Sequence, residues 1–164
     1  MADGEISSDD PRVPDVRALL ERHLVFVNAL SPPEDVHALD VDGLLDPAIS
    51  FYSYRVAGRL VGVGALKRLG PDHGEIKSMH TAAEARGRGV GRAMVEHLVR
   101  VARDEGLRRL SLETGTAAAF APARSLYALA GFAPCGPFGD YVESRHSTFM
   151  SLDLAATPGL VPPR

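Results

Sequence analysis

A glycine-rich segment joins a predicted strand to a predicted helix near the middle of this 164-residue chain. Residues 86–92 read RGRGVGR, so three glycines and three arginines surround one apolar side chain, Val90. The preceding residues 74–82 have a strand-like composition, and from residue 90 onward apolar residues recur at helical spacing. A further strand is predicted at residues 107–114. This strand–helix–strand order has the length of a right-handed parallel crossover, which predicts an α/β fold.

The other predicted elements surround this crossover. In chain order they are a helix at 13–30, a shorter helix near 41–45, a strand hairpin at 49–56 and 59–69, a helix within 121–132 and a last strand at 147–154. The hairpin strands are joined by Ala57 and Gly58, a short turn that makes them antiparallel. We therefore expect a mixed, mostly antiparallel central sheet with one parallel strand–helix–strand crossover, flanked by helices.

The length and the apolar content of 45% suit one globular domain with a single core. Residues 1–12 are polar and acidic, and we expect them to form a disordered N-terminal lead. Residues 155–164 are rich in proline and small side chains, which predicts a flexible C-terminal tail. The predicted domain therefore spans residues 13–154.

Charge and cysteine content exclude several classes of protein. The formal net charge of −3 gives no general affinity for nucleic acids or anionic membranes, so any phosphate recognition must be local. Cys135 is the only cysteine, which excludes an intrachain disulfide and a multi-cysteine zinc site. The six histidines show no metal-ligand spacing. With no signal peptide or membrane-length apolar run, we expect a cytoplasmic protein that needs no metal.

The glycine-rich segment has the chemistry of an anion site. A helix N-terminus offers unpaired N–H groups and a positive dipole, and glycines let the backbone approach a ligand closely, which suits phosphate. The dinucleotide fingerprint G-x-G-x-x-G fails because Arg92 stands where its last glycine is required, and the P-loop motif is absent. The pattern present is Arg86-x-x-Gly89-x-Gly91. The alternative is a plain glycine turn with solvated arginines.

This pattern resembles the Q/R-x-x-G-x-G/A signature of the GNAT superfamily of N-acetyltransferases. The segment RSLYALAGF at 124–132 is similar to the second motif of that family, a helix carrying LY…GF. The segments EIKSMHTAAEARGRGVG, LSLETG and GPFGDY further resemble a bacterial subgroup of small-molecule acetyltransferases. The resemblance covers about residues 15–154, in matching element order.

The resemblance implies an acetyl-CoA-dependent enzyme that acetylates a primary amine by direct transfer. The implied acceptor is a small molecule or an amino-acid-like compound, and a homodimer is common in the family. Two alternatives stay open, namely acetylation of a protein lysine or N-terminus, and a non-catalytic CoA-binding sensor. A peptide groove would favour the first, whereas intact catalytic side chains argue against the second.

The resemblance also places the CoA contacts. It implies that the backbone edge at Met79, His80 and Thr81 binds the pantetheine arm, and that an N–H near Met79 stabilises the oxyanion. The loop residues implied for the CoA phosphates are Arg86, Gly87, Arg88, Gly89, Val90, Gly91 and Arg92. Many members carry an asparagine near the start of the second-motif helix. This chain lacks it, so that contact is either missing or supplied by Arg124.

The acceptor amine must lose a proton. A lysine-like ammonium has a pKa near 10.4, so only about one molecule in 2,500 is neutral at pH 7, a penalty of about 4.6 kcal/mol. Glu75 is the leading candidate for the general base, with pairing to Lys77 as its alternative. Glu113 is the second candidate, and His80 is a third with a more common structural role. Tyr127 matches the family tyrosine that protonates the leaving thiolate, although it could also simply pack.

A polar and aromatic segment precedes the last predicted strand. The resemblance implies that such segments border the acceptor site, which makes Phe138, Asp140 and Tyr141 candidates for acceptor binding. An anionic side chain such as Asp140 could receive a cationic amine. The alternative is a solvated loop.

Overall fold

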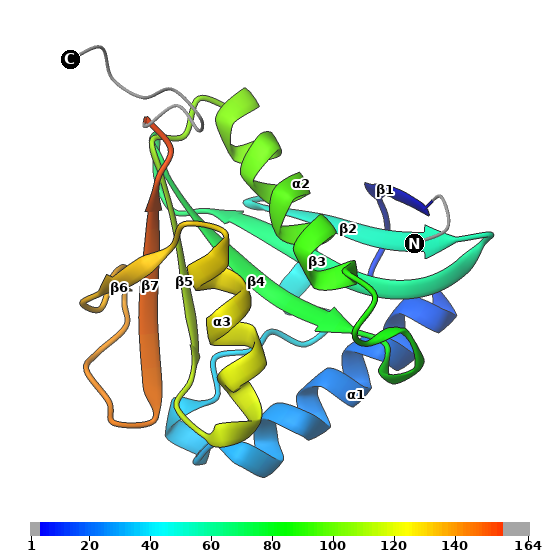
Figure 1. The fold of residues 1–164 in the computed structure, drawn as a ribbon, viewed down its shortest axis with the longest axis horizontal. Helices are drawn as coiled ribbons and strands as arrows, with labels where there is room; N and C mark the ends of the chain where they lie inside the picture. Colours follow the sequence, from blue (N-terminus) through cyan, green and yellow to red (C-terminus); the bar gives the residue numbers. More distant parts are fainter. Residues whose placement is uncertain (1–3, 156–164) are drawn as a thin grey trace.

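The computed structural model describes residues 4–155, which form a seven-stranded sheet in the order β1-β2-β3-β4-β5-β7-β6 (Figure 1). The strands are β1 (Gly4–Ser8), β2 (Ile49–Val56), β3 (Arg59–Arg68), β4 (His73–Thr81), β5 (Arg109–Gly115), β6 (Ala133–Cys135) and β7 (Ser147–Asp153). The helices are α1 (Pro14–Leu30), α2 (Val90–Asp104) and α3 (Ala121–Leu129). Four 3-10 turns are η1 (Pro33–Asp35), η2 (Gly43–Leu45), η3 (Ala83–Ala85) and η4 (Ala118–Phe120). Only β4 and β5 pair in parallel, and the other neighbours are antiparallel.

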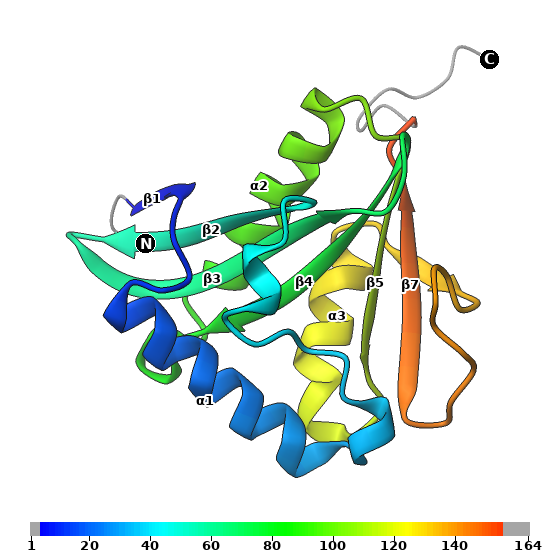
Figure 2. The same cartoon turned by 180° about the vertical axis from the view of Figure 1, so that it is seen from behind.

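Helices cover both faces of the sheet. α2 and α3 lie on one face and α1 lies on the other, as Figures 1 and 2 show from opposite sides. The central strand β3 is therefore buried along most of its length. Its Gly64 lets α2 approach closely, because a Cβ there would stand 2.7 Å from Met94 Cγ. Leu98 of α2 and Leu19 of α1 are fully buried and fill the core from the two sides. Within residues 4–155, no helix combines the length and the apolar character needed to cross a bilayer.

The parallel pair separates soon after it begins. β4 and β5 are paired only from His73 opposite Arg109 to Glu75 opposite Ser111. Farther along β4, a register shift against β3 coincides with Ser78, whose φ of 55° is in the left-handed region. Such a bulge bends the strand and increases its twist. The C-terminal halves of β4 and β5 are consequently free to line a cavity.

The predicted fold class is confirmed, including the central crossover and the flanking helices. The disordered lead over residues 1–12 is wrong at Gly4–Ser8, which form β1 and pair with β2. An edge strand needs only backbone partners on one side, and here Ile6 is its single half-buried side chain. The short helix predicted near 41–45 is the 3-10 turn η2. The predicted tail falls almost wholly on residues 156–164, which lie outside the described residues.

Candidate active site

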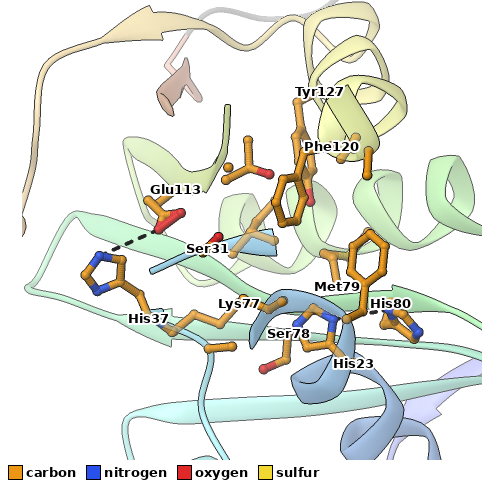
Figure 3. A pocket seen from close by; sticks show the side chains of 18 of the residues that line it. His23, Ser31, His37, Lys77, Ser78, Met79, His80, Glu113, Phe120 and Tyr127 are labelled. Atoms are coloured by element: carbon orange, nitrogen blue, oxygen red, sulfur yellow. Dashed lines mark hydrogen bonds and ion pairs between the residues drawn. The ribbon is translucent and has the colours of Figure 1, made fainter. Parts of the chain in front are cut away.

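A cavity of about 410 Å³ lies where β4 and β5 separate. Side chains from α1, β4, β5, α3 and four connecting segments line it (Figure 3). The structure brings together in its wall eight of the residues predicted from sequence, namely Glu75, Met79, His80, Thr81, Arg86, Glu113, Tyr127 and Tyr141. The cavity therefore joins the predicted catalytic side chains to the predicted cofactor edge of β4.

The glycine-rich loop forms an open N-terminus for α2. Gly89 is the N-cap residue with φ of 80°, and Gly87 has φ of 77°, both in the left-handed region. No side chain caps the helix, and a Cβ at either glycine would meet nothing within 4 Å. At Gly91 a Cβ would lie 3.0 Å from Leu126 of α3, so this glycine allows the two helices to approach. The exposed N–H groups and helix dipole suit a phosphate.

The arginines near this loop have different surroundings. Arg86 lines the cavity, and Arg88 is exposed. The exposed Arg92 pairs with Glu96 one helical turn away, with 3.1 Å between Nε and Oε1. The side chain of Val90 is buried in the core, so only its backbone faces the loop.

Arg124 does not line the cavity. Its Nη1 donates to the carbonyl oxygens of Gly115, at 2.7 Å, and Ala117, at 3.1 Å. The guanidinium therefore holds the connection from β5 to η4, and nothing in this arrangement directs it toward a pantetheine arm.

A buried polar network occupies the wall formed by β4. Lys77 Nζ lies 3.2 Å from Glu75 Oε2 and 3.0 Å from the hydroxyl of Tyr141, and that hydroxyl donates to the same carboxylate oxygen. Glu75 is only 3% exposed. Burial and the Glu75 charge raise the pKa of Tyr141 above its usual value, so it remains a protonated donor. The pairing of Glu75 with Lys77, left open as the alternative to a base, is thus the contact that the structure contains.

Glu113 faces the cavity from β5, and its surroundings differ from those of Glu75. Its side chain is 11% exposed, and its Oε2 lies 4.0 Å from Nε2 of His37. Burial raises its pKa to about 7; the charge of Lys77 opposes that increase, and Glu75 and Asp35 add to it. A carboxyl group with this pKa can both accept and release a proton at neutral pH.

Tyr127 projects into the cavity from α3, on the opposite side of Glu113 from His37 (Figure 3). Its ring packs edge-to-face with Phe132, with 5.9 Å between centroids. Burial raises the pKa of its hydroxyl above the ordinary value of 10. Tyr127 therefore combines the packing role and a protonated hydroxyl at the cavity wall.

His80 is engaged with a second histidine. Nδ1 of His80 lies 3.1 Å from Nδ1 of His23 on α1, and burial lowers the pKa of each ring to about 4. Both rings are therefore neutral at pH 7, with one nitrogen donating to the other. This contact ties α1 to β4 and fits the structural role that sequence analysis left open for His80.

The loop before β7 contributes one of its three candidates to the cavity. Tyr141 lines the cavity, whereas Phe138 is buried against Tyr141 and Phe149. Asp140 is exposed and lies outside the cavity lining. The loop is held to η1 by Ser144, whose hydroxyl donates to Asp35 at 2.9 Å.

Comparisons with known proteins identify the family. Residues 15–132 match the model of the acetyltransferase (GNAT) family. The uncharacterized N-acetyltransferase YedL of Escherichia coli is 47% identical over 149 residues, which cover 91% of this chain and 94% of that protein. The chain belongs to the GNAT acetyltransferase family. It is accordingly an acyltransferase of the N-acetyltransferase type.

A further relative of this GNAT protein is an IAA acetyltransferase of Azospirillum brasilense, 37% identical over 150 residues that cover 91% of this chain and 97% of that one. Among solved structures, a Klebsiella pneumoniae protein described as an acyl-CoA N-acyltransferase has a TM-score of 0.76 at 24% identity, covering 92% of this chain and 97% of its own. A Bacillus subtilis acetyltransferase in complex with CoA has a TM-score of 0.70 at 20% identity, and the match covers 92% of this chain and 99% of that one. These structures support the GNAT fold.

Sequence reasoning missed several cavity residues of this GNAT domain. His37 lies between two 3-10 turns, in a segment whose composition gives no periodic signal. His23 and Phe26 lie on α1, where helical spacing alone does not distinguish cavity residues from core residues. Among residues 4–155, no group of three His, Cys, Asp or Glu side chains is arranged to hold a metal ion.

Proposed function

We propose that this protein transfers the acetyl group of acetyl-CoA directly to a primary amine of a small-molecule acceptor. One observation carries the proposal: a single cavity joins the predicted cofactor edge of β4 to Glu113, whose pKa is about 7, and to Tyr127. CoA bound to the B. subtilis structural neighbour supports the choice of donor. The cavity volume of about 410 Å³ supports a small acceptor.

The residues present fit acetyl-CoA, which supplies an activated thioester. The N–H groups of residues 87–92 and the open N-terminus of α2 would hold its phosphates. The edge of β4 at Met79 and Thr81 would bind the pantetheine arm, because the separation of β5 leaves that backbone unpaired on one side. Arg86 adds positive charge where the loop meets the cavity.

Glu113 is the general base in this proposal. Its raised pKa matches it to a proton transfer near neutral pH, where a base near pKa 7 is most effective. Glu75 is less suited because one of its carboxylate oxygens already accepts from both Lys77 and Tyr141. Glu75 instead fixes Lys77 and Tyr141 as a rigid wall of the acceptor side.

Tyr127 is the general acid. Its raised pKa makes it a weaker acid than an exposed tyrosine, which by itself opposes proton donation to a thiolate. A thiolate released into the same buried cavity is also desolvated, which raises its basicity in parallel. The hydroxyl also holds its proton until negative charge develops on the leaving sulfur.

The test is acceptor-dependent release of CoA, followed with a chromogenic thiol reagent. The panel of acceptors is tyramine, putrescine, L-lysine and a short lysine-containing peptide, each offered with acetyl-CoA. We expect a small amine to give turnover. Glu113→Gln should lower kcat/KM by about 100-fold or more. Glu84→Gln, which changes an exposed carboxylate on η3, is the matched control and should retain the wild-type rate.

Three outcomes would count against parts of this proposal. CoA release with the peptide alone would exclude the small-molecule acceptor. Wild-type kinetics in Glu113→Gln would place the base elsewhere. Binding of acetyl-CoA without release for any acceptor would favour a CoA-binding sensor.

A further inference from the structure

His37 stands at the outer edge of the cavity, next to the proposed base. It lies on the segment between η1 and η2, and its side chain is 31% exposed, whereas that of Glu113 is 11% exposed. Figure 3 shows its ring directed at the Glu113 carboxylate, on the side of the cavity away from His23 and His80. The ring therefore lies between a buried carboxyl group and solvent.

The proposed reaction, on which this inference rests, requires a path by which one proton leaves the cavity in each turnover. An ammonium acceptor and acetyl-CoA yield the acetamide, CoA with its thiol protonated, and one free proton. The nitrogen loses two protons; one ends on the sulfur, delivered through Tyr127, and the other is taken by Glu113. Glu113 must release that proton before the next turnover, and its carboxyl group is largely enclosed.

We propose that His37 carries the proton from Glu113 to solvent. The 4.0 Å between Nε2 and Oε2 exceeds a direct hydrogen bond, so one bridging water completes the path. Histidine is suited to this task because its ring gains and loses a proton near neutral pH. His37 acts through Glu113 and is thus a positioning and relay residue, with no contact to the acceptor required.

The surroundings of His37 favour its neutral form and orient its ring. Burial and the charge of Lys77 on β4 lower its pKa, while Asp35 on η1 and Glu75 on β4 act in the opposite direction. The ring stands edge-on to Tyr141, with 4.8 Å between centroids. The lowered pKa makes the protonated ring a transient carrier: it takes a proton from the adjacent Glu113 carboxyl group against its own preference and releases it readily to solvent.

The other cavity histidines do not offer the same path. His23 and His80 bond to each other, and their pKa values of about 4 leave them poor acceptors at neutral pH. His37 is consequently the histidine of this cavity that is both adjacent to Glu113 and open to solvent.

His37→Phe tests the relay, because it keeps an aromatic ring against Tyr141 and removes the nitrogens that carry a proton. The assay is steady-state kinetics from pH 6 to 9 with the fastest acceptor of the amine panel, in dilute buffer and with added imidazole. We expect kcat to fall about tenfold or more in dilute buffer and to recover with imidazole. The KM for acetyl-CoA should stay unchanged. His146→Phe, on the loop before β7, is the matched control.

A second arm needs no acceptor. The ring C–H signal of His37 is followed by NMR against pH in the wild type and in Glu113→Gln. We expect the pKa of His37 to differ between the two proteins because the carboxyl group and the ring titrate as a coupled pair. An identical pKa would overturn the relay, as would a His37→Phe variant with full kcat and no response to imidazole.

The kinetic arm also separates this inference from the proposed function. Loss of activity in His37→Phe with full activity in Glu113→Gln would overturn the relay from Glu113 while leaving acetyl transfer intact. No CoA release with any amine would count against the proposed function, and the NMR arm would then decide the coupling alone.

Discussion

Replacing Glu113 by glutamine should remove a pH-dependent loss of stability. The pKa of Glu113 is about 7 in the folded protein against an ordinary value of 4.5, because burial disfavours its charged form. Between these two pH values the folded state binds more protons than the unfolded state, so folding is weakened as pH rises through this window. At about 1.36 kcal/mol per pH unit, the interval from 4.5 to about 7 costs at most about 3.4 kcal/mol above pH 7.

Urea unfolding at pH 5 and pH 8 measures this effect. At pH 5 part of the penalty is already present, so the linkage relation gives about 2.5 kcal/mol between the two conditions. We expect the wild-type free energy of unfolding to fall by about this much more than that of Glu113→Gln. Glu84→Gln, an exposed carboxylate replaced in the same way, should follow the wild type. Equal changes for Glu113→Gln and the wild type would refute the burial argument and remove the main reason to choose Glu113 as the base.

Three further perturbations follow from the structure. Gly89→Ala places a side chain at φ of 80° and should cost about 1–2 kcal/mol in thermal unfolding, whereas Gly70→Ala, in open space, should cost nothing. Lys77→Met leaves the Glu75 carboxylate buried without its ion-pair partner, which should cost about 3 kcal/mol in urea unfolding, and a second change of Glu75→Gln should recover part of the loss. Leu98→Ala empties a fully buried position and should cost about 3–5 kcal/mol in the same assay; a cost below 1 kcal/mol would contradict the packing described.

Much of the fold could be predicted because its signals are local. The apolar spacing of α2, the glycine-rich loop before it and the Ala57-Gly58 turn each determine one piece of backbone. β1 was missed because an edge strand is held by backbone pairing with β2, which leaves little trace in side-chain composition. β6 is only three residues long and contains Pro134, so it is too short to show the alternation of apolar and polar residues that predicts a strand.

The site was predicted less completely because its members meet only in the folded chain. Tyr127 could be proposed from the family motif, and Glu113 from its position at the end of a predicted strand. The pairing of Glu75 with Lys77, which competes with a role as general base, could also be foreseen, since Lys77 lies two residues along the same strand face. His37 could not be found, because its meeting with Glu113 depends on the path of an irregular segment. The contacts of Arg124 could not be foreseen, because its carbonyl partners belong to a loop whose shape the sequence does not specify.

Acetyl-CoA binding at the open N-terminus of α2 underlies the proposed function, and a calorimetric titration tests this binding most directly. Wild-type protein is titrated with acetyl-CoA, and with NAD and ATP as controls. We expect selective binding of acetyl-CoA that is abolished in Gly89→Glu, because the new carboxylate would stand where the phosphates are held. Circular dichroism should show that this variant is folded. A folded wild-type protein that does not bind acetyl-CoA, or that binds NAD or ATP equally well, would contradict the proposed function.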